Sequence, residues 1–587
     1  MNAGFRRVFA SRCALLEGTN LQARGNRLFS ARKWGRPALL ALILAASFLL
    51  RVHEAHALPW YTDEGLFADV TRHLLAGMPS GNCLKENGFF PLTAGLLDPL
   101  LGSVAVKFSG LAALPALRLW SALLGTGVCA LLAWLGATMK DRNLGLAAAA
   151  CYSLLPMAVH LDGMAFYHHA AVDMELACCV LCLRFLADGK ALSYLAASLL
   201  AGIAAASAYY LFWLLPLVLA AAWYRRKATL LAPGLALMVL PLGVQAALAY
   251  SLDPTSFRAE VGFILFQAHS RFPFALRLLG VFKTLQAFPC LPAGMTGLIW
   301  LACVGRRRDG RWPWVLAFAV ACSVEAFRQR ANLSMFPFPL ILSLPWVGLG
   351  LAALALAALR LAGRPEKPGL ARPLASVALL ATFAAGLLAR PAFGEITALS
   401  APIRQAEAML GFLGTRLKPG DLVIGQASFN WALPAGVSGT EFDVMAAYRG
   451  RESDFFPTDY LPGRFTRPLP LADCRFFVMS SYQYLQFQAP FARRQVLEME
   501  RQAWPMVWTD GYYRVYGNPA FGVRPAARPD LILGDGGLYD QAALEAWRRG
   551  DLALARFAFR RGLNFPAHRD WRLRQLALLD RAARGRR

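Results

Sequence analysis

Charged residues are scarce in this chain of 587 residues: Asp, Glu, Lys and Arg together make up 17%, whereas hydrophobic residues make up 57%. Soluble globular proteins carry about 25% charged residues. The mean hydropathy of +0.41 is also far too high for a soluble protein. Acids are the scarcer charge, with 36 Asp and Glu against 61 Lys and Arg. This composition excludes an ordinary soluble globular protein and predicts a polytopic α-helical membrane protein.

The eleven cysteines lack the spacing of a metal-binding motif. Most of them fall inside long apolar runs, where Cys behaves as a small apolar packing residue. These are Cys129, Cys151, Cys178, Cys179, Cys182, Cys303 and Cys322. Cys83 and Cys474 fall outside the runs, and they are either a disulfide formed in an oxidising compartment or two separate thiols.

Long apolar runs take up most of the chain between Pro37 and Arg390. A helix needs about 20 apolar residues to cross the roughly 30 Å of hydrocarbon in a bilayer. We count eleven runs that approach this length and predict a membrane-spanning helix for each. They lie near residues 37–52, 115–138, 144–160, 171–187, 191–207, 208–224, 229–250, 287–304, 313–327, 335–359 and 373–390.

The positions of Lys and Arg predict the orientation, because short loops rich in these residues stay in the cytoplasm. The segment 1–36 carries eight Lys and Arg against one acid, Glu17, so it should be cytoplasmic. The first apolar run follows this basic region without a small-residue cleavage site and is expected to be a retained anchor. Eleven spans then place the residues after 390 outside. Loop asymmetry and a basic C-terminal tail account for most of the net charge of +25, so no nucleic-acid partner is inferred.

Four parts are predicted from the changes in composition. Residues 1–36 form a cytoplasmic basic arm, and residues 37–390 form the membrane domain. Within the latter, residues 53–114 form a long outer loop with interfacial helices, since Leu66, Val70 and Leu74 recur at helical spacing. Residues 391–530 form an extracytoplasmic α/β domain, and residues 531–587 form a basic helical tail.

The α/β prediction rests on a change of periodicity after Arg390. Residues 402–417 show helical spacing, and a Lys-Pro-Gly-Asp turn leads from them into Leu422-Val423-Ile424. Cys474 to Ser480 and Tyr512 to Tyr516 are further apolar runs of strand length. The domain should therefore contain at least three strands and a preceding helix.

An adjacent acid pair, Asp63 and Glu64, follows the first span directly. Ionised carboxylates close to hydrocarbon are costly and seldom incidental. The pair is therefore the leading candidate for a general base that works on a lipid-borne substrate. The alternative is an N-cap and first-turn acid of the interfacial helix, where negative charge is favourable. Tyr61, just before the pair, is a candidate for substrate contact or for the interfacial aromatic belt.

Two further polar clusters fall on the same predicted side. At the start of the fourth span, His169 and Asp173 are four residues apart and share a helix face, with His168 next to them. The two histidines are candidates for substrate binding or for interfacial packing. Arg328 and Arg330 lie between the ninth and tenth spans, on the predicted outer side, where the positive-inside tendency disfavours cations. A guanidinium group binds phosphate well, so the two arginines are candidates for phosphate binding. The alternative is that they reach lipid headgroups.

These motifs together resemble the GT-C glycosyltransferases, in particular the protein O-mannosyltransferases and the lipid A aminoarabinose transferases. The resemblance covers roughly residues 37–390 and rests on the order and sidedness of short motifs. They are Asp63-Glu64 in the first outer loop, Phe89-Phe90-Pro91-Leu92 opening a surface helix, Ala116-Leu117-Arg118-Leu119 entering the second span, and Asp173 starting the fourth.

The resemblance implies an inverting transferase that moves a sugar from a polyprenyl-phosphate carrier to a hydroxyl at the outer leaflet. Asp63 would be the base with Glu64 beside it, and Asp173 would position donor or acceptor. Arg328 and Arg330 fall where related transferases hold phosphate. Lys85 lies where they place a basic residue ahead of the surface helix. It precedes Glu86-Asn87, where relatives show a Lys or His beside a double proline.

No cofactor is required by this chemistry, although Asp63, Asp173 and the histidines could hold a divalent metal. The expected partners are a polyprenyl-phosphate-sugar, membrane lipids and an acceptor that is lipid A, another envelope glycan or a protein. The expected location is a bacterial inner membrane. A transporter or flippase of lipid-linked glycans is the alternative, but transporters place charges near mid-bilayer and often show two related halves. A non-catalytic assembly protein is a second alternative.

Overall fold

The structure is a computed structural model, and it describes most of the chain in segments. The described residues are 35–75, 97–165, 168–252, 254, 257, 261, 281–286, 288–305, 309–331, 338–362, 371–388, 400–425, 427–434, 436–440, 471–480 and 490–585. Within these segments, the side chains of some helical residues lie outside the described part, among them those of Asp63, Arg328 and Arg330.

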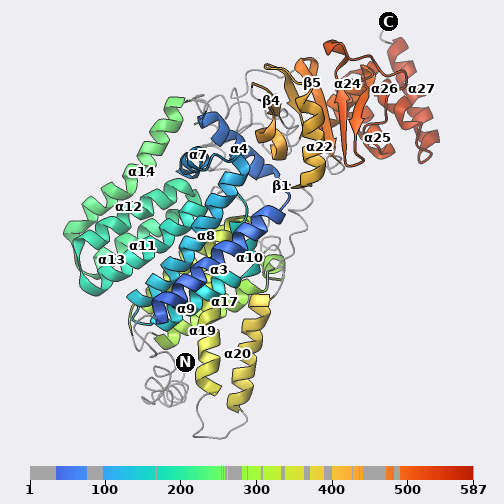
Figure 1. The fold of residues 1–587 in the computed structure, drawn as a ribbon. Helices are drawn as coiled ribbons and strands as arrows, with labels where there is room; N and C mark the ends of the chain where they lie inside the picture. The colour runs from blue at the N-terminus through green and yellow to red at the C-terminus, as the bar shows by residue number, and fades with distance from the viewer. Residues whose placement is uncertain are drawn as a thin grey trace.

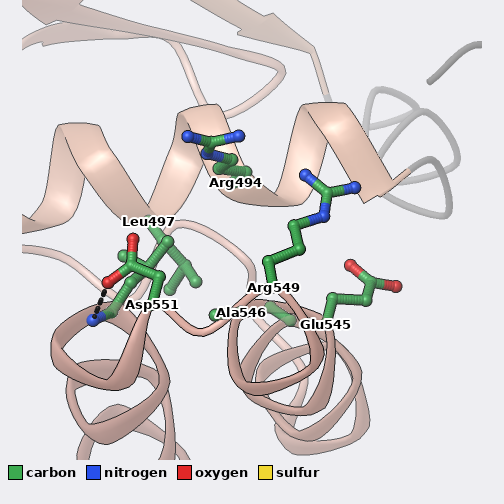
Figure 2. A pocket seen from close by; sticks show the side chains of 8 residues that line it. Arg494, Leu497, Glu545, Ala546, Arg549 and Asp551 are labelled. Carbon is green, nitrogen blue, oxygen red and sulfur yellow. Dashed lines mark hydrogen bonds between the residues drawn. The ribbon is translucent and has the colours of Figure 1, made fainter. Parts of the chain in front are cut away.

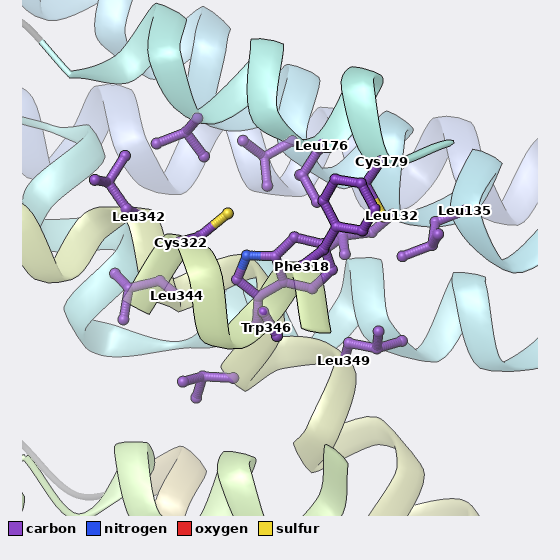
Figure 3. Packing of buried hydrophobic residues seen from close by; sticks show 14 of the residues in the cluster. Leu132, Leu135, Leu176, Cys179, Phe318, Cys322, Leu342, Leu344, Trp346 and Leu349 are labelled. Atoms are coloured by element: carbon purple, nitrogen blue, oxygen red, sulfur yellow. The ribbon is translucent and has the colours of Figure 1, made fainter. Parts of the chain in front are cut away.

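A bundle of apolar helices makes up the larger part of the molecule (Figure 1). Its described helices are α3 (Gly35–Ala57), α8 (Ala113–Thr138), α9 (Arg142–Leu154), α10 (Pro156–Asp162), α11 (His169–Asp188), α12 (Ala191–Ser207), α13 (Leu214–Tyr224), α14 (Leu231–Leu252), α17 (Cys290–Gly305), α18 (Trp312–Ala331), α19 (Leu344–Ala362) and α20 (Ala371–Leu388). Their buried faces join in one hydrophobic core, where Trp346 packs among Phe318 and Leu132 (Figure 3).

Four described helices are long and apolar enough to cross a membrane, or five if the bent pair α9 and α10 is one span. Together with shorter apolar helices they make the chain a multi-pass membrane protein. Helix α11 has 20 residues but carries Asp173, Glu175, Arg184 and Asp188, which lower its hydropathy. The number of eleven spans stays a prediction.

The predicted span at 144–160 is broken near its end. Helix α9 stops at Leu154, Leu155 is extended, and α10 begins at Pro156 with a bend of 67°. A residue before proline avoids the helical region, and proline suits the first position of a new helix. The break redirects the chain and buries Asp162, the last residue of α10, inside the bundle.

Two helices lie over the end of the bundle nearest the C-terminal domain (described residues from 400 to 585), which is named the outer domain because it lies outside the bundle (Figure 1). They are α4 (Thr62–Leu75) and α7 (Leu97–Ser109), and they occupy the positions of the predicted interfacial helices as far as these are described. Both pack against each other and against α8. Residues 76–96, with Cys83 and Lys85, lie outside the described residues.

The outer domain is built on a five-stranded sheet of order β4-β3-β5-β7-β6. The strands are β3 (Leu422–Ile424), β4 (Ser438–Thr440), β5 (Cys474–Ser480), β6 (Met506–Thr509) and β7 (Tyr513–Gly517). The pairs β3–β4 and β3–β5 are parallel, and β5–β7 and β6–β7 are antiparallel. Strands β3 and β5 occupy the same residues as two of the predicted strands.

Alternation along the strands explains how helices cover both faces of this sheet, because successive side chains point to opposite sides. Val423 and Phe476 face a core under α22 (Ile403–Gly414). Ile424 and Phe477 face a second core, under the remaining helices. These are α24 (Pro490–Arg501), α25 (Gly536–Arg548), α26 (Leu552–Gly562) and α27 (Arg569–Gly585).

Position 530 is the predicted boundary between the α/β domain and the basic helical tail. Residues on both sides of it share the second core, since Tyr539 and Phe559 pack with Phe477. Glu500 of α24 adds a polar link, because it accepts a hydrogen bond from Ile532 N at 2.8 Å and pairs with Arg561 at 2.7 Å. Burial raises the pKa of the Glu500 carboxyl. Cys474 is buried in β5, and its pairing with Cys83 stays a prediction because Cys83 is not described.

Candidate active site

The acid pair lies in the first turn of α4. The chain leaves α3, forms the two-residue strand β1 (Trp60–Tyr61) and enters α4 at Thr62. Asp63 is the second residue of the helix, where a negative charge is stabilised by the exposed backbone N–H groups. Glu64 is the third, and its Oε2 accepts from the N–H of Tyr61 at 3.2 Å. This return bond is one half of a capping box.

Glu64 also forms a buried ion pair with Arg118 of α8. Arg118 donates from Nε to Oε1 at 2.9 Å and from Nη2 to Oε2 at 2.7 Å, so both carboxylate oxygens are engaged. The N–H of Ala165 donates to Oε1 at 2.6 Å. Glu64 is fully buried and Arg118 is 4% exposed. Four hydrogen bonds engage this carboxylate, and this geometry suits a residue that fixes α4 in place.

Arg118 binds the connection between α3 and α4 as well. Its guanidinium donates to the carbonyl oxygens of Ala55 and Leu58, each at 2.8 Å, and of Pro59 at 2.6 Å. The last carbonyls of a helix have no partner within it, so a cation there satisfies them. One arginine therefore joins the end of α3, the start of α4 and helix α8.

A second buried ion pair lies deeper in the bundle. Arg51 of α3 donates from Nε to Asp162 Oδ2 at 2.8 Å, and Tyr152 OH donates to the same oxygen at 2.9 Å. Arg51 also donates to Ser47 Oγ at 2.7 Å. His169 Nε2 lies 3.1 Å from the carbonyl oxygen of Leu161 and 3.6 Å from Asp162 Oδ1. These contacts join α3, α9, α10 and α11 through polar groups in an apolar interior.

Glycine at position 125 of α8 is required for this pair. A Cβ there would lie 2.3 Å from Asp162 Oδ2 and 2.7 Å from Arg51 Nε, distances that real Cβ atoms essentially never show. Two residues further on, a Cβ at Gly127 would lie 3.3 Å from Asp173 Oδ1. The two glycines thus let α8 approach the acids of α10 and α11.

Asp98 is buried and Asp173 is half-buried, and each has one buried carboxyl oxygen without a hydrogen-bond partner. Asp98, at the start of α7, accepts from the N–H of Ala170 at 3.2 Å through its other oxygen, Oδ1. Burial raises the pKa of the Asp98 carboxyl to about 7, although that hydrogen bond lowers it. The charges of Asp98 and Asp162 both act on Asp173, so the three acids form one electrostatic group.

The structure brings several of the predicted site residues to one end of the bundle. Glu64 contacts Ala165, just ahead of α11, and Asp173 lies in the first half of α11. Tyr61 is buried in β1, and His168 and His169 are buried at the start of α11. His169 contacts Asp162 of α10, whereas its predicted partner, Asp173, lies on α11.

The remaining predicted residues are placed only in part. Asp63, Arg328 and Arg330 are placed by their backbones on α4 and α18, and their side chains are outside the described part. Lys85 is not among the described residues.

The sequence did not lead to a prediction that Arg51, Asp98 and Asp162 are site residues. Arg118 was part of a predicted motif but had no predicted role. The available signal was charge inside or beside apolar runs, since Arg51 ends the first run and Asp162 follows the third. Ionisable residues in membrane helices usually pair with one another. The partner itself could not be read from the sequence, because Arg51 and Asp162 are 111 positions apart.

Among the described residues, no three His, Cys, Asp or Glu side chains are grouped as ligands of a metal ion. We therefore derive no step through a metal. A cavity of about 130 Å³ lies in the outer domain between α24, α25 and α26 (Figure 2). It is lined by Arg494, Leu497, Ala542, Glu545, Ala546, Arg549, Asp551 and Leu554. It is separated from the acids described above by the sheet (Figure 1).

The acids at this end of the bundle differ in how far their oxygens are engaged. Both oxygens of Glu64 accept hydrogen bonds from Arg118 and Ala165. Asp98 and Asp173 offer unpaired carboxyl oxygens that can accept hydrogen bonds from hydroxyl groups.

Comparison with known proteins gives matches among solved structures alone. No family model matches the sequence, and no curated protein matches it. ArnT from Cupriavidus metallidurans bound to undecaprenyl phosphate is 14% identical, with a TM-score of 0.53 over 84% of this chain and 100% of that one. The apo ArnT gives 0.49 at 14% identity over 84% and 99% of the two chains. The Archaeoglobus fulgidus oligosaccharyltransferase tethered to an acceptor peptide gives 0.46 at 14% identity over 84% and 75%.

The match to ArnT extends over the whole length of that protein and over 84% of this chain. At 14% identity it shows a shared fold. The predicted resemblance to GT-C membrane glycosyltransferases is thereby confirmed at the level of fold.

Proposed function

We propose that this chain, which has the fold of GT-C membrane glycosyltransferases, transfers a sugar from a polyprenyl-phosphate carrier to a hydroxyl of a cell-envelope acceptor. The observation that carries the proposal is the meeting of α4 with the segment ahead of α11 through Glu64 and Ala165. It puts Asp63 at the same end of the bundle as Asp98 and Asp173. The ArnT structure, described as bound to undecaprenyl phosphate, supports the choice of a polyprenyl carrier.

The step requires one base and a place for the departing phosphate. Asp63 accepts the proton of the acceptor hydroxyl while the hydroxyl oxygen forms a bond to the anomeric carbon. The bond between that carbon and the phosphate oxygen breaks, and its electron pair leaves with the polyprenyl phosphate. Attack from the opposite side inverts the anomeric configuration. The phosphate gains charge as the bond breaks, so fixed cations lower the barrier.

Glu64 and Arg118 act in this proposal as positioning residues. Their ion pair holds the first turn of α4 against α8, so Asp63 keeps a fixed place relative to α11. Asp173, and with it Asp98, would accept hydrogen bonds from sugar hydroxyls. We place the reaction on the outer side of a bacterial inner membrane, with the N-terminal arm in the cytoplasm.

The direct test is transfer in proteoliposomes that contain the purified protein. Undecaprenyl-phosphate carriers labelled in a hexose, a pentose or an amino pentose are supplied with envelope fractions as acceptors. Transfer of label from at least one donor is expected, and mass spectrometry of the product identifies sugar and acceptor together. Movement of lipid-linked glycan across the bilayer without transfer would instead support the transporter alternative, and neither activity would refute both.

Donor binding gives a second prediction. We propose that Arg328 and Arg330, on the last turns of α18, hold the donor phosphate. Hydrogen bonds to a charged group contribute about 1.5–3 kcal/mol each. The two arginines together contribute about 3–6 kcal/mol, so the double variant Arg328→Ala/Arg330→Ala should raise the donor KM by roughly 10²- to 10⁴-fold. Initial rates against donor concentration measure this.

The matched control for the arginine pair is Lys107→Ala, which removes an exposed cation from α7. It should leave the donor KM unchanged. A donor KM that stays at the wild-type value in the arginine double variant, with the protein folded, would contradict a phosphate site there.

A further inference from the structure

Helix α4 is held from two sides by two parts of the molecule. On the membrane side, Glu64 pairs with Arg118 and accepts from Ala165 N. On the outer side, α4 packs along the short helix η4 (Ala427–Ala432), which belongs to the outer domain. More than 350 positions separate the two helices in the chain. The helix that carries Asp63 therefore lies between the bundle and the outer domain.

The outer domain holds the start of α4 through a pair of short strands. Trp60 and Tyr61 of β1 pair antiparallel with Ala401 and Ser400 of β2 (Ser400–Ala401). This pairing ends directly before Thr62, the first residue of α4. The pairing restrains the backbone up to Tyr61, two positions before Asp63.

The ring of Trp431 in η4 contacts the strand β1 that precedes α4. The rings of Trp60 and Trp431 meet edge to face, with centroids 5.0 Å apart and planes at 71°. Edge-to-face geometry is favourable because the positive edge of one ring meets the negative face of the other. Trp431 is 9% exposed, and its indole Nε1 donates to Ser428 O at 3.1 Å, which fixes the ring in its own helix.

The apolar cluster at this junction has members from both parts of the molecule. Trp431 packs with Phe67 and Ala68 of α4, and with Leu117 of α8 and Ala165 ahead of α11. Ala68 is fully buried in this cluster. The outer domain thus contributes one large side chain to a core that otherwise belongs to the bundle.

Arg72 provides a third contact, near the other end of α4. Its Nη1 donates to the carbonyl oxygens of Leu433 at 2.8 Å and Trp431 at 3.4 Å. Carbonyls at the end of a short helix have no partner within it, and a cation satisfies them. The two ends of α4 are therefore attached to the same few residues of the outer domain.

We propose that the outer domain is a working part of the catalytic unit, in which Trp431 and Arg72 are positioning residues that set the place of Asp63. This inference rests on the proposed function. Because α4 is a continuous helix from Thr62 to Leu75, a shift of its outer contacts moves its first turn as a rigid body. A displacement of about 1 Å at a reacting group can cost 100-fold in rate.

The test compares three variants of the full-length protein in proteoliposomes with the labelled donor that gives transfer in the wild type. Trp431→Ala is expected to lower kcat by about 10- to 100-fold with little change in the donor KM. Trp431→Phe keeps an aromatic ring and should recover most of the rate. Arg72→Met keeps the apolar stem and should lower kcat by less than Trp431→Ala.

Two controls separate positioning from folding. Trp508→Ala removes a ring of the same domain that stacks on Phe412, and it should leave the kcat of folded protein unchanged. In an Asp63→Asn background, Trp431→Ala should produce no further loss, because residues that act through one group are not additive.

A wild-type kcat in folded Trp431→Ala and Arg72→Met would overturn the inference and leave the proposed function intact. So would an equal loss from Trp508→Ala, or a full further loss in the Asp63→Asn background. If Trp431→Ala does not fold, Arg72→Met decides by the same criteria. Absence of transfer by the wild type with every donor would instead refute the proposed function.

Discussion

Asp63→Asn is expected to lower sugar transfer by about 10²- to 10⁴-fold, the range that a positioned base contributes. The amide keeps the size of the side chain but cannot accept the proton of the acceptor hydroxyl. The protein should still insert and fold, because the ion pair of Glu64 with Arg118 and the apolar contacts of α4 do not involve residue 63. The measurement is the rate of label transfer at saturating donor, per unit of folded protein.

The matched control for Asp63 is Asp69→Asn, a change of the same kind two turns further along α4. It should transfer at the wild-type rate. Near-normal turnover by folded Asp63→Asn would remove Asp63 as the base. In that case Asp173→Asn and Asp98→Asn would be the next variants to assay, since these acids have unpaired oxygens at the same end of the bundle.

Arg118→Met is expected to destabilise the protein by about 3–5 kcal/mol, the cost of leaving one member of a buried ion pair without the other. Glu64 would stay buried without its cation, and the carbonyls of Ala55, Leu58 and Pro59 would lose their donor. We expect a large fall in the thermal midpoint of the detergent-solubilised protein. Size-exclusion chromatography with fluorescence detection, after heating to a series of temperatures, measures this midpoint.

Adding Glu64→Gln to Arg118→Met should recover part of this loss, because a neutral amide is less costly to bury than an unpaired carboxylate. Arg142→Met, an exposed arginine at the start of α9, should leave the midpoint within a few degrees. A midpoint for Arg118→Met as high as that of Arg142→Met would show that the Glu64–Arg118 pair does not hold α4.

These two predictions separate the members of the acid pair, which the sequence alone treats alike. Both residues lie in the first turn of a helix next to the membrane. From the sequence alone, a catalytic role and a structural role are each open to either residue. The contacts distinguish them, since Glu64 receives four hydrogen bonds from three partners. Loss of activity without loss of stability is therefore expected at position 63, and loss of stability at position 118.

Local sequence was sufficient for those features that depend on near neighbours. Composition and the length of apolar runs predicted a multi-pass membrane protein, because hydrocarbon thickness sets the length of a spanning helix. Short apolar runs predicted strands at Leu422–Ile424 and Cys474–Ser480, and helical spacing predicted the helix that begins with the acid pair.

The broken helix is an intermediate case. Pro156 was visible in the sequence, but an apolar run of suitable length around it favoured one continuous span. The bend of 67° follows from the conformation of Leu155 before proline, and its consequence for Asp162 depends on where α3 and α8 lie.

The sequence by itself determined the class of the molecule, its apolar helices, strands β3 and β5 of the outer domain and the acids worth testing, since all of these follow from composition and spacing over a few residues. Only the tertiary structure decided which charges meet. Arg118 binds Glu64 across 54 positions, Arg51 binds Asp162 across 111, and Arg72 binds the outer domain across 361. A buried charge needs a partner, but the folded arrangement of helices selects that partner.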